Sequence, residues 1–261
     1  MRCVSIISGL VLFVPLALAA PTHSSPVVTM DVAFIDNRSS NDPFGHAGIN
    51  LNLDVGVRDS PGVGLMVSVV SSNSSFPFTQ PVKVTTNPYI VPANALVQFT
   101  KMLPLSSDQL PSVKGNYTFT ITNSNWESVK TTSSNLDNPA VIQLPTGLTF
   151  SNHTTTPVFS FTDPNPTPCA RTLVRRYRME IFDADTLARI YNSRDNQQRP
   201  SFTVPDGILK AGWKYYFRAL ILDIDRSHTS GTTHSRWQNR AIEYAPFEPA
   251  PLSPGSGQRL Q

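Results

Sequence analysis

The sequence predicts an all-β protein built from two β-sandwich domains, and three observations support that prediction. First, residues 215–224 form a long aromatic and aliphatic run whose alternate side chains would belong to the two faces of a strand. Second, helical periodicity is scarce, and only the segments 92–98 and 106–110 suggest short helical turns. Third, a leucine, a glycine and a tyrosine precede a strand-like run at two separate places.

The first nineteen residues have the pattern of a cleaved signal peptide. Arg2 supplies a positive start, residues 4–18 are apolar, and Ala17 and Ala19 form a small-residue cleavage pattern. The apolar run is short for a membrane span, which needs about 20 residues, and no second run of that length follows. We therefore expect segment 1–19 to be removed and the mature chain to be exported. It would be secreted, or periplasmic in a Gram-negative host, without a membrane span.

The first predicted domain covers residues 27–150. It opens with a strand over 28–35, alternates cleanly over 49–55, and has a fuller apolar run at 65–70. Near its end, Leu110 and Gly115 precede an alternating run that starts at Tyr117. One sandwich takes about 100 residues, so the mature chain is long for one and sufficient for two.

The second predicted domain covers residues 155–247 and is bounded on its N-terminal side by a polar Asn-His-Thr-Thr-Thr run. In the strand expected at 177–182, Tyr177, Met179 and Ile181 would face inward. Arg178 and Glu180 would face outward. Beyond this domain, segment 248–261 is rich in Pro, Gly and Ser, and we expect it to be a disordered tail.

The spacing of Leu209, Gly212 and Tyr215 resembles the tyrosine corner of fibronectin type III domains. The resemblance extends over 155–247, because proline-bounded and alternating strands surround the motif in the order of that family. It implies a fibronectin type III-like second sandwich, after a first that is immunoglobulin-like. It also implies that the tyrosine hydroxyl bonds back to loop backbone. The resemblance concerns fold, since this architecture hosts many unrelated functions.

The cysteine count and the charge distribution limit the possible functions. Only Cys3 and Cys169 are present, and Cys3 leaves with the signal peptide, so no internal disulfide is expected. The net positive charge resides in the second domain, where Arg171, Arg175, Arg176 and Arg178 are close in sequence. Arginines at alternating strand positions are typical of the solvated face of a sheet, so we expect no nucleic-acid partner.

The densest polar segment contains Asp223, Asp225 and His228, which we take as candidate ligand contacts. Carboxylates two residues apart can share a calcium ion, as can Asp183 and Asp185, but neither segment continues with the glycine and glutamate of a calcium loop. Aspartates also commonly shape turns. No cofactor, metal site or catalytic motif is therefore predicted.

Trp126 is the best candidate for a surface aromatic, because it follows the strand 117–121 in a polar turn. Three sequons, at Asn37, Asn73 and Asn152, are candidate N-glycosylation sites in a eukaryotic host. A fourth, at Asn116, is set aside because it adjoins an expected core tyrosine.

These features predict a secreted, non-catalytic binding or structural module that contacts an extracellular protein or glycan. The alternative is an accessory domain of a carbohydrate-active hydrolase, or a cryptic hydrolase that uses loop acids such as Asp223 and Asp225.

Overall fold

The computed structural model describes residues 25–59, 64–86, 96–132, 136–193, 197–225 and 237–250. The predicted signal peptide 1–19, most of the predicted tail and His228 lie outside these residues. No helix in the described part of the chain is long and apolar enough to cross a membrane.

The described chain is almost entirely β, as predicted. Its elements are, in order, β1 (Val27–Arg38), β2 (Gly48–Arg58), β3 (Leu65–Ser71), β4 (Val82–Thr86), β5 (Leu96–Pro104), the 3-10 helix η1 (Ser107–Val113), β6 (Tyr117–Asn123), β7 (Ser128–Thr132), β8 (Thr146–Phe150), β9 (Val158–Thr162), β10 (Leu173–Asp183), β11 (Arg189–Asn192), β12 (Ser201–Thr203), β13 (Tyr215–Asp225) and β14 (Trp237–Phe247).

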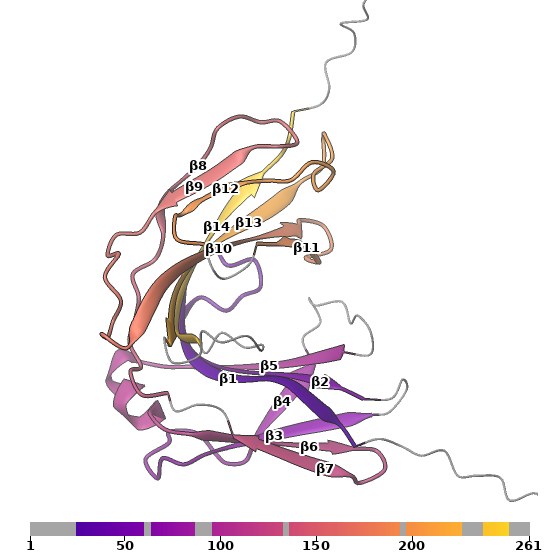
Figure 1. The fold of residues 1–261 in the computed structure, drawn as a ribbon, viewed down its shortest axis with the longest axis vertical. Coiled ribbons are helices and arrows are strands. Elements are labelled where there is room, and N and C mark those ends of the chain that lie inside the picture. The colour runs from indigo at the N-terminus through magenta and orange to yellow at the C-terminus, as the bar shows by residue number, and fades with distance from the viewer. Residues whose placement is uncertain are drawn as a thin grey trace, which may run out of the picture.

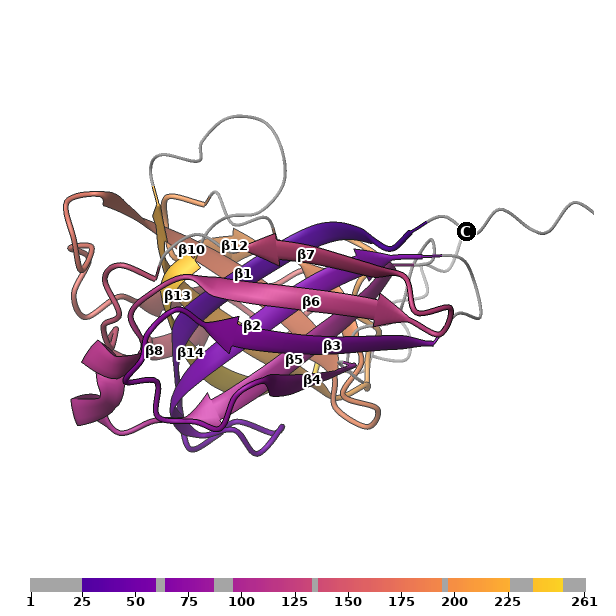
Figure 2. The ribbon, with the colours of Figure 1, turned by 90° about the horizontal axis from the view of Figure 1, so that it is seen from below.

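Two sandwich-like lobes follow each other in the chain (Figure 1). In the N-lobe, which we define as β1–β7 with η1, β2 pairs with β1 and β5, while β3 pairs with β4 and β6. Strand β4 also pairs with β5, so the N-lobe is one continuous sheet folded over its own core. Figure 2 shows β3, β6 and β7 side by side in front of β1 and β2.

The C-lobe, which we define as β8–β14, has two separate layers. One layer has the order β11-β10-β13-β14, and the other is the three-stranded sheet β12-β9-β8. Aromatic rings fill the space between them: Phe217 contacts Phe150 at 4.9 Å and Phe159 at 5.2 Å between ring centroids. This burial of alternate side chains from facing sheets is the packing expected of a β-sandwich.

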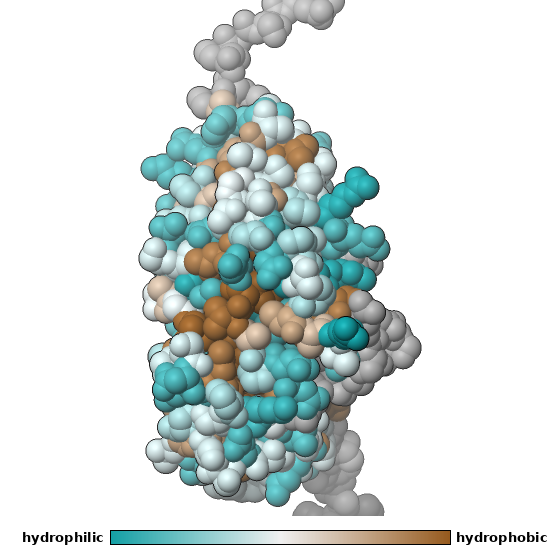
Figure 3. All heavy atoms as spheres, turned by 90° about the vertical axis from the view of Figure 1, so that its left-hand side faces the viewer, coloured by the Kyte–Doolittle hydropathy of each residue, from teal (hydrophilic) through white to brown (hydrophobic). Residues whose placement is uncertain are grey.

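The two lobes share one sheet. Strand β1 pairs with β2 along its length, and its last residues, Ile35–Arg38, also pair in parallel with β14. Eleven strands therefore form one hydrogen-bonded sheet that runs from β11 in the C-lobe to β7 in the N-lobe. On the side of the molecule shown in Figure 3, apolar surface gathers at mid-height, between the ends of the two lobes.

Both tyrosine corners have the predicted hydrogen bond. The Tyr215 hydroxyl accepts from the Lys210 amide at 2.9 Å, and the Tyr117 hydroxyl donates to the Val113 carbonyl. The glycines of the two motifs have positive φ, +72° at Gly212 and +143° at Gly115, which explains why glycine stands there.

Other details differ from the sequence predictions. Strand β8 pairs with β9, so the segment 146–150, which the predicted division gave to the first domain, lies in the sheet of the second. Ile142 also packs in the C-lobe core. Of the suggested helical turns, 106–110 lies at η1, whereas Leu96–Gln98 begin β5.

Candidate functional site

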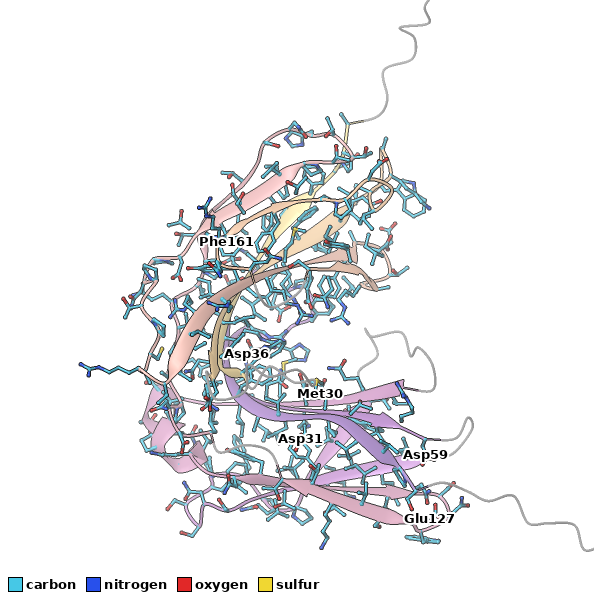
Figure 4. The ribbon with its side chains drawn as sticks, in the orientation of Figure 1. Met30, Asp31, Asp36, Asp59, Glu127 and Phe161 are labelled. Carbon is cyan, nitrogen blue, oxygen red and sulfur yellow. The ribbon has the colours of Figure 1, made fainter. Side chains whose placement is uncertain are left out.

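The described side chains hold two candidate regions. One is the face of the shared sheet that points away from both cores where the lobes join, which we call the junction face. Its members belong to β10, β13, β14, β1 and β2, and they are Arg178, Glu180, Phe182, Arg218, Arg240, Tyr244, Phe34, Asp36, Arg38, Asn52 and Asp54. The other is the tip of the β6–β7 hairpin around Trp126. Figure 4 places Asp36 at the junction, and Asp59 and Glu127 at the far end of the N-lobe.

Asp36 is the centre of the junction face. It is fully buried, and both its oxygens accept hydrogen bonds from Arg240, at 3.0 and 2.7 Å, while Arg38 Nε donates to Oδ2 at 2.7 Å. Burial alone would raise the pKa of Asp36, but the two guanidinium groups outweigh it and hold that pKa well below its usual range. Since Asp36 belongs to β1 and Arg240 to β14, this ion pair joins the lobes.

Two aromatic rings contact the same arginine. The Arg240 guanidinium carbon lies 4.5 Å from the Phe34 ring centroid and 5.1 Å from that of Trp237. The two rings meet edge to face at 5.1 Å. A planar guanidinium that stacks on rings while it bonds a carboxylate bidentately is held in one orientation.

Glu180 forms a second ionic centre in the C-lobe part of this face. Its carboxylate contacts Arg178, Arg218 and, at 3.0 Å, Arg189 Nη1. The prediction that Arg178 and Glu180 face solvent is therefore wrong: they are 7% and 1% exposed. They do lie opposite the core residues Tyr177, Met179 and Ile181, as alternation requires, but that second face is buried too.

Asp54 and Asn52 of the junction face each have one buried oxygen outside such pairing. Both are buried, and within the described residues no hydrogen-bond donor contacts Oδ1 of either side chain. Burial raises the pKa of Asp54, and the Arg240 charge and the Thr100 hydroxyl offset only part of that effect. The carboxylates of the junction face are thus either neutralised by arginine or, at Asp54, disfavoured as ions.

Asp223, a predicted ligand contact, is instead part of the scaffold. It is fully buried; one of its oxygens accepts from Arg175 Nε at 2.8 Å and the other from the Cys169 amide at 2.9 Å. Arg175 also donates to Asp163 at 2.7 Å and to the Thr167 carbonyl at 2.9 Å. Together these bonds fix the proline-rich loop 163–169, and they engage both oxygens of Asp223.

Among the other polar candidates, Asp183 also has a structural role. Asp183 Oδ1 accepts from the Asp185 amide and from the amide and hydroxyl of Thr186, which closes a turn. Asp225 is half-buried at the end of β13. Burial and the Asp223 carboxylate raise the pKa of the Cys169 thiol to about 12, so the thiol stays protonated. Within the described ranges, no group of three His, Cys, Asp or Glu residues is placed to hold a metal ion.

Trp126 is the most exposed large apolar side chain of the described residues, at 80%. It lies in the turn between β6 and β7 with φ of +64°, a conformation that normally selects glycine. The turn is rigid because Asn123 closes it: its side-chain oxygen accepts from the Asn125 and Glu127 amides at 3.0 Å each, and its Nδ2 donates to Glu127 at 2.8 Å.

The other two tryptophans differ from Trp126. Trp237 is half-buried against Phe34 and Arg240 of the junction face, and Trp213 is 49% exposed with the Lys210 ammonium 4.5 Å above its ring. Trp126 is therefore the candidate that the structure leaves open to a partner.

Comparisons with known proteins do not assign a family. No protein-family model matches the chain, and no curated protein matches it. A search of solved structures returns the chicken interferon gamma receptor alpha chain, at 14% identity and a TM-score of 0.32, over 88% of this chain and 99% of that one. The fold assignment therefore rests on the strands and their pairing described above.

Proposed function

We propose that the chain is an exported, non-catalytic binding module that contacts an extracellular protein or glycan through the β6–β7 tip. The observation that carries the proposal is Trp126, a bulky side chain that combines a left-handed backbone with 80% exposure. The backbone conformation costs about 1 kcal/mol for a residue other than glycine. Burial does not compensate, so a contact outside the chain gives the indole its role.

The surroundings of Trp126 suit recognition of a partner. The turn is fixed by the bonds of Asn123, so little conformational entropy is lost when a partner binds the indole. Tryptophan offers a large flat apolar face with one N–H donor, which fits a sugar ring or an apolar side chain with polar neighbours. Glu127 follows Trp126 in the chain and supplies a carboxylate at the edge of the proposed contact surface.

The hydrolase alternative loses support at Asp223, one of the two acids named for it. Asp223 bonds Arg175 and the Cys169 amide with its two oxygens, and elsewhere in the C-lobe the Glu180 carboxylate is paired with arginines. A general acid or a nucleophile needs a carboxylate that can reach substrate.

The test is a binding screen of the mature chain, residues 20–261, on glycan and extracellular-protein arrays, with and without calcium. For any hit, affinity is measured for the wild type and for Trp126→Ala, with Trp213→Ala as the matched control for loss of an exposed indole. We expect Trp126→Ala to weaken binding by at least about tenfold, which corresponds to about 1.4 kcal/mol, and Trp213→Ala to leave it unchanged. Equal affinity for all three proteins, or binding abolished only by Trp213→Ala, would contradict the proposal.

A further inference from the structure

The sequence contains four Asn-x-Ser/Thr sequons, and their structural settings differ sharply. N-glycosylation modifies the side-chain nitrogen Nδ2 of the asparagine, so the folded protein must leave room for a sugar at that atom. We propose that Asn152 and Asn116 carry glycans, and that Asn37 does not. The proposal rests on the proposed export of the chain, and it applies where that export runs through a eukaryotic secretory pathway.

Asn37 is partly buried where the two lobes meet. It lies in β1 where that strand pairs on both sides, opposite Ile49 of β2 and Ala241 of β14. Its Nδ2 donates a 2.9 Å hydrogen bond to the carbonyl of Ile142, a residue of the C-lobe core. A sugar on this nitrogen would have to occupy space where the two lobes meet. The folded protein is therefore incompatible with a glycan at Asn37.

Asn73 is intermediate. Its Nδ2 donates to the Lys114 carbonyl at 2.9 Å and to the Pro111 carbonyl at 3.4 Å, so both amide hydrogens are in use at the end of η1. A glycan replaces one of these hydrogens and would remove one bond. We expect at most partial occupancy at this site.

Asn152 is open. It is exposed, and its side chain uses only its oxygen, which accepts from the Thr154 hydroxyl at 2.6 Å and from the Thr154 amide at 3.2 Å. The asparagine and the threonine of the sequon thus lie together on a surface turn, and within the described residues no contact engages Nδ2.

Asn116 is also open, against the expectation from its neighbour in sequence. Tyr117 is fully buried, but side chains alternate along an extended chain, so Asn116 and Thr118 lie on the opposite, outer side. Asn116 is exposed, and its fixed contacts are made by the backbone: its amide donates to Ser72 Oγ at 3.0 Å, and its carbonyl accepts from the Ser72 amide at 2.9 Å. Nδ2 has no assigned partner among the described residues.

The reaction needs a glycan donor that a eukaryotic secretory pathway supplies, a lipid-linked oligosaccharide pyrophosphate. The bond between the first sugar carbon and the pyrophosphate oxygen breaks, and that carbon bonds to Nδ2. The asparagine amide loses one proton, and the lipid pyrophosphate leaves.

The experiment expresses the chain in a eukaryotic secretory host behind the host's own signal sequence, so that entry into the pathway does not depend on residues 1–19. Intact mass and gel mobility are read before and after treatment with an amidase that removes N-glycans. We expect one glycan to disappear in each of Asn152→Gln and Thr154→Ala, and one in each of Asn116→Gln and Thr118→Ala. Asn37→Gln should leave the glycan mass unchanged.

Each other outcome has a defined meaning. A secreted, folded protein that lacks the glycan at Asn152 or at Asn116 overturns the proposal. So does a glycan at Asn37. In a parallel expression with residues 1–19 as the leader, failure to reach the medium contradicts export, which belongs to the proposed function, and leaves the glycan pattern of the first experiment valid.

Discussion

At the scale of single residues, Trp126 and Asp54 occupy positions that elementary physical chemistry disfavours. Trp126 has a left-handed backbone without burial in return, and Asp54 is a buried acid whose Oδ1 has no donor within the described residues. Such residues are informative, because a position without a function would be expected to hold a residue that fits it at a lower free energy. Each leads to a stability measurement: one tests the backbone strain at Trp126, and the other tests the free-energy cost of ionising Asp54.

At Trp126, we expect Trp126→Gly to be more stable than Trp126→Ala by about 0.5–1 kcal/mol, measured by urea unfolding. The reason is that alanine keeps the strained backbone at φ of +64°, whereas glycine adopts it freely. Both variants lose the indole, so both should lose partner binding. If alanine proved the more stable, the turn would not be strained as the structure indicates.

At Asp54, the raised pKa has a definite sign for stability. A carboxyl whose pKa is raised on folding destabilises the native state as pH rises above the unfolded value of about 3.9, and the cost grows until the folded pKa is passed. Asp54→Asn removes this cost, so we expect a higher thermal midpoint at pH 7, by about 2–4 °C for each kcal/mol gained.

The control for this prediction is pH itself. The difference between Asp54→Asn and the wild type should shrink below pH 4, where the aspartate is protonated in both states. The charged groups that influence Asp54, namely Arg240, Asp36 and Arg38, are unchanged by the variant. A difference that is constant between pH 3 and pH 7 would mean that packing, and not ionisation, distinguishes the two proteins.

At the scale of elements, the tyrosine corners are the best-defined local devices. Tyr215→Phe removes the hydroxyl that accepts from the Lys210 amide, and Tyr117→Phe removes the donor to the Val113 carbonyl. We expect each to lower the free energy of unfolding by about 1 kcal/mol in denaturant titrations. Tyr216→Phe is the matched control, since that half-buried ring has no assigned hydroxyl bond in the described structure. Equal effects in all three would refute the corner assignment.

The local sequence pattern predicts these strands and corners well, but it predicts poorly which of their faces are buried. The corner spacing and the alternation of β6, β10 and β13 are visible in the sequence, because alternate side chains of a strand point to opposite faces of the sheet. Which faces are buried depends on partners distant in the chain. The polar residues Asn50, Asn52 and Asp54 of β2 look like a solvated face, yet all three are buried.

The same limit applies to the candidate site. The polar turn around Trp126 predicts a surface residue, and the side chain is exposed. The local sequence of Asp223 does not reveal its partner, because Arg175 is 48 residues away, in the neighbouring strand β10. Asp36 and Arg240 are 204 residues apart in the chain, and the local sequence around neither residue predicts their contact. Only the parallel pairing of β1 with β14 brings these two residues together.

At the scale of the whole molecule, that pairing makes the lobes one structural unit. Asp36 of β1 holds Arg240 of β14 while both are buried, and the two strands share a ladder at this point. Asp36→Asn leaves Arg240 without its carboxylate partner in a buried setting, and Arg38 keeps only Asp42, so we expect it to lower the free energy of unfolding by about 3–5 kcal/mol. The exposed Asp206→Asn is the control and should cost little.

Native-state hydrogen exchange shows whether this loss is shared between the lobes. If the two lobes unfold as one cooperative unit, amides of β6 in the N-lobe and of β9 in the separate sheet of the C-lobe lose the same protection free energy in Asp36→Asn. Neither strand contains the substituted residue or pairs with β1. An equal loss of protection free energy in both strands therefore means that the two lobes are energetically coupled through the junction. A loss confined to β6 would mean that the lobes unfold independently, and that the Asp36–Arg240 pair serves only to orient one lobe against the other.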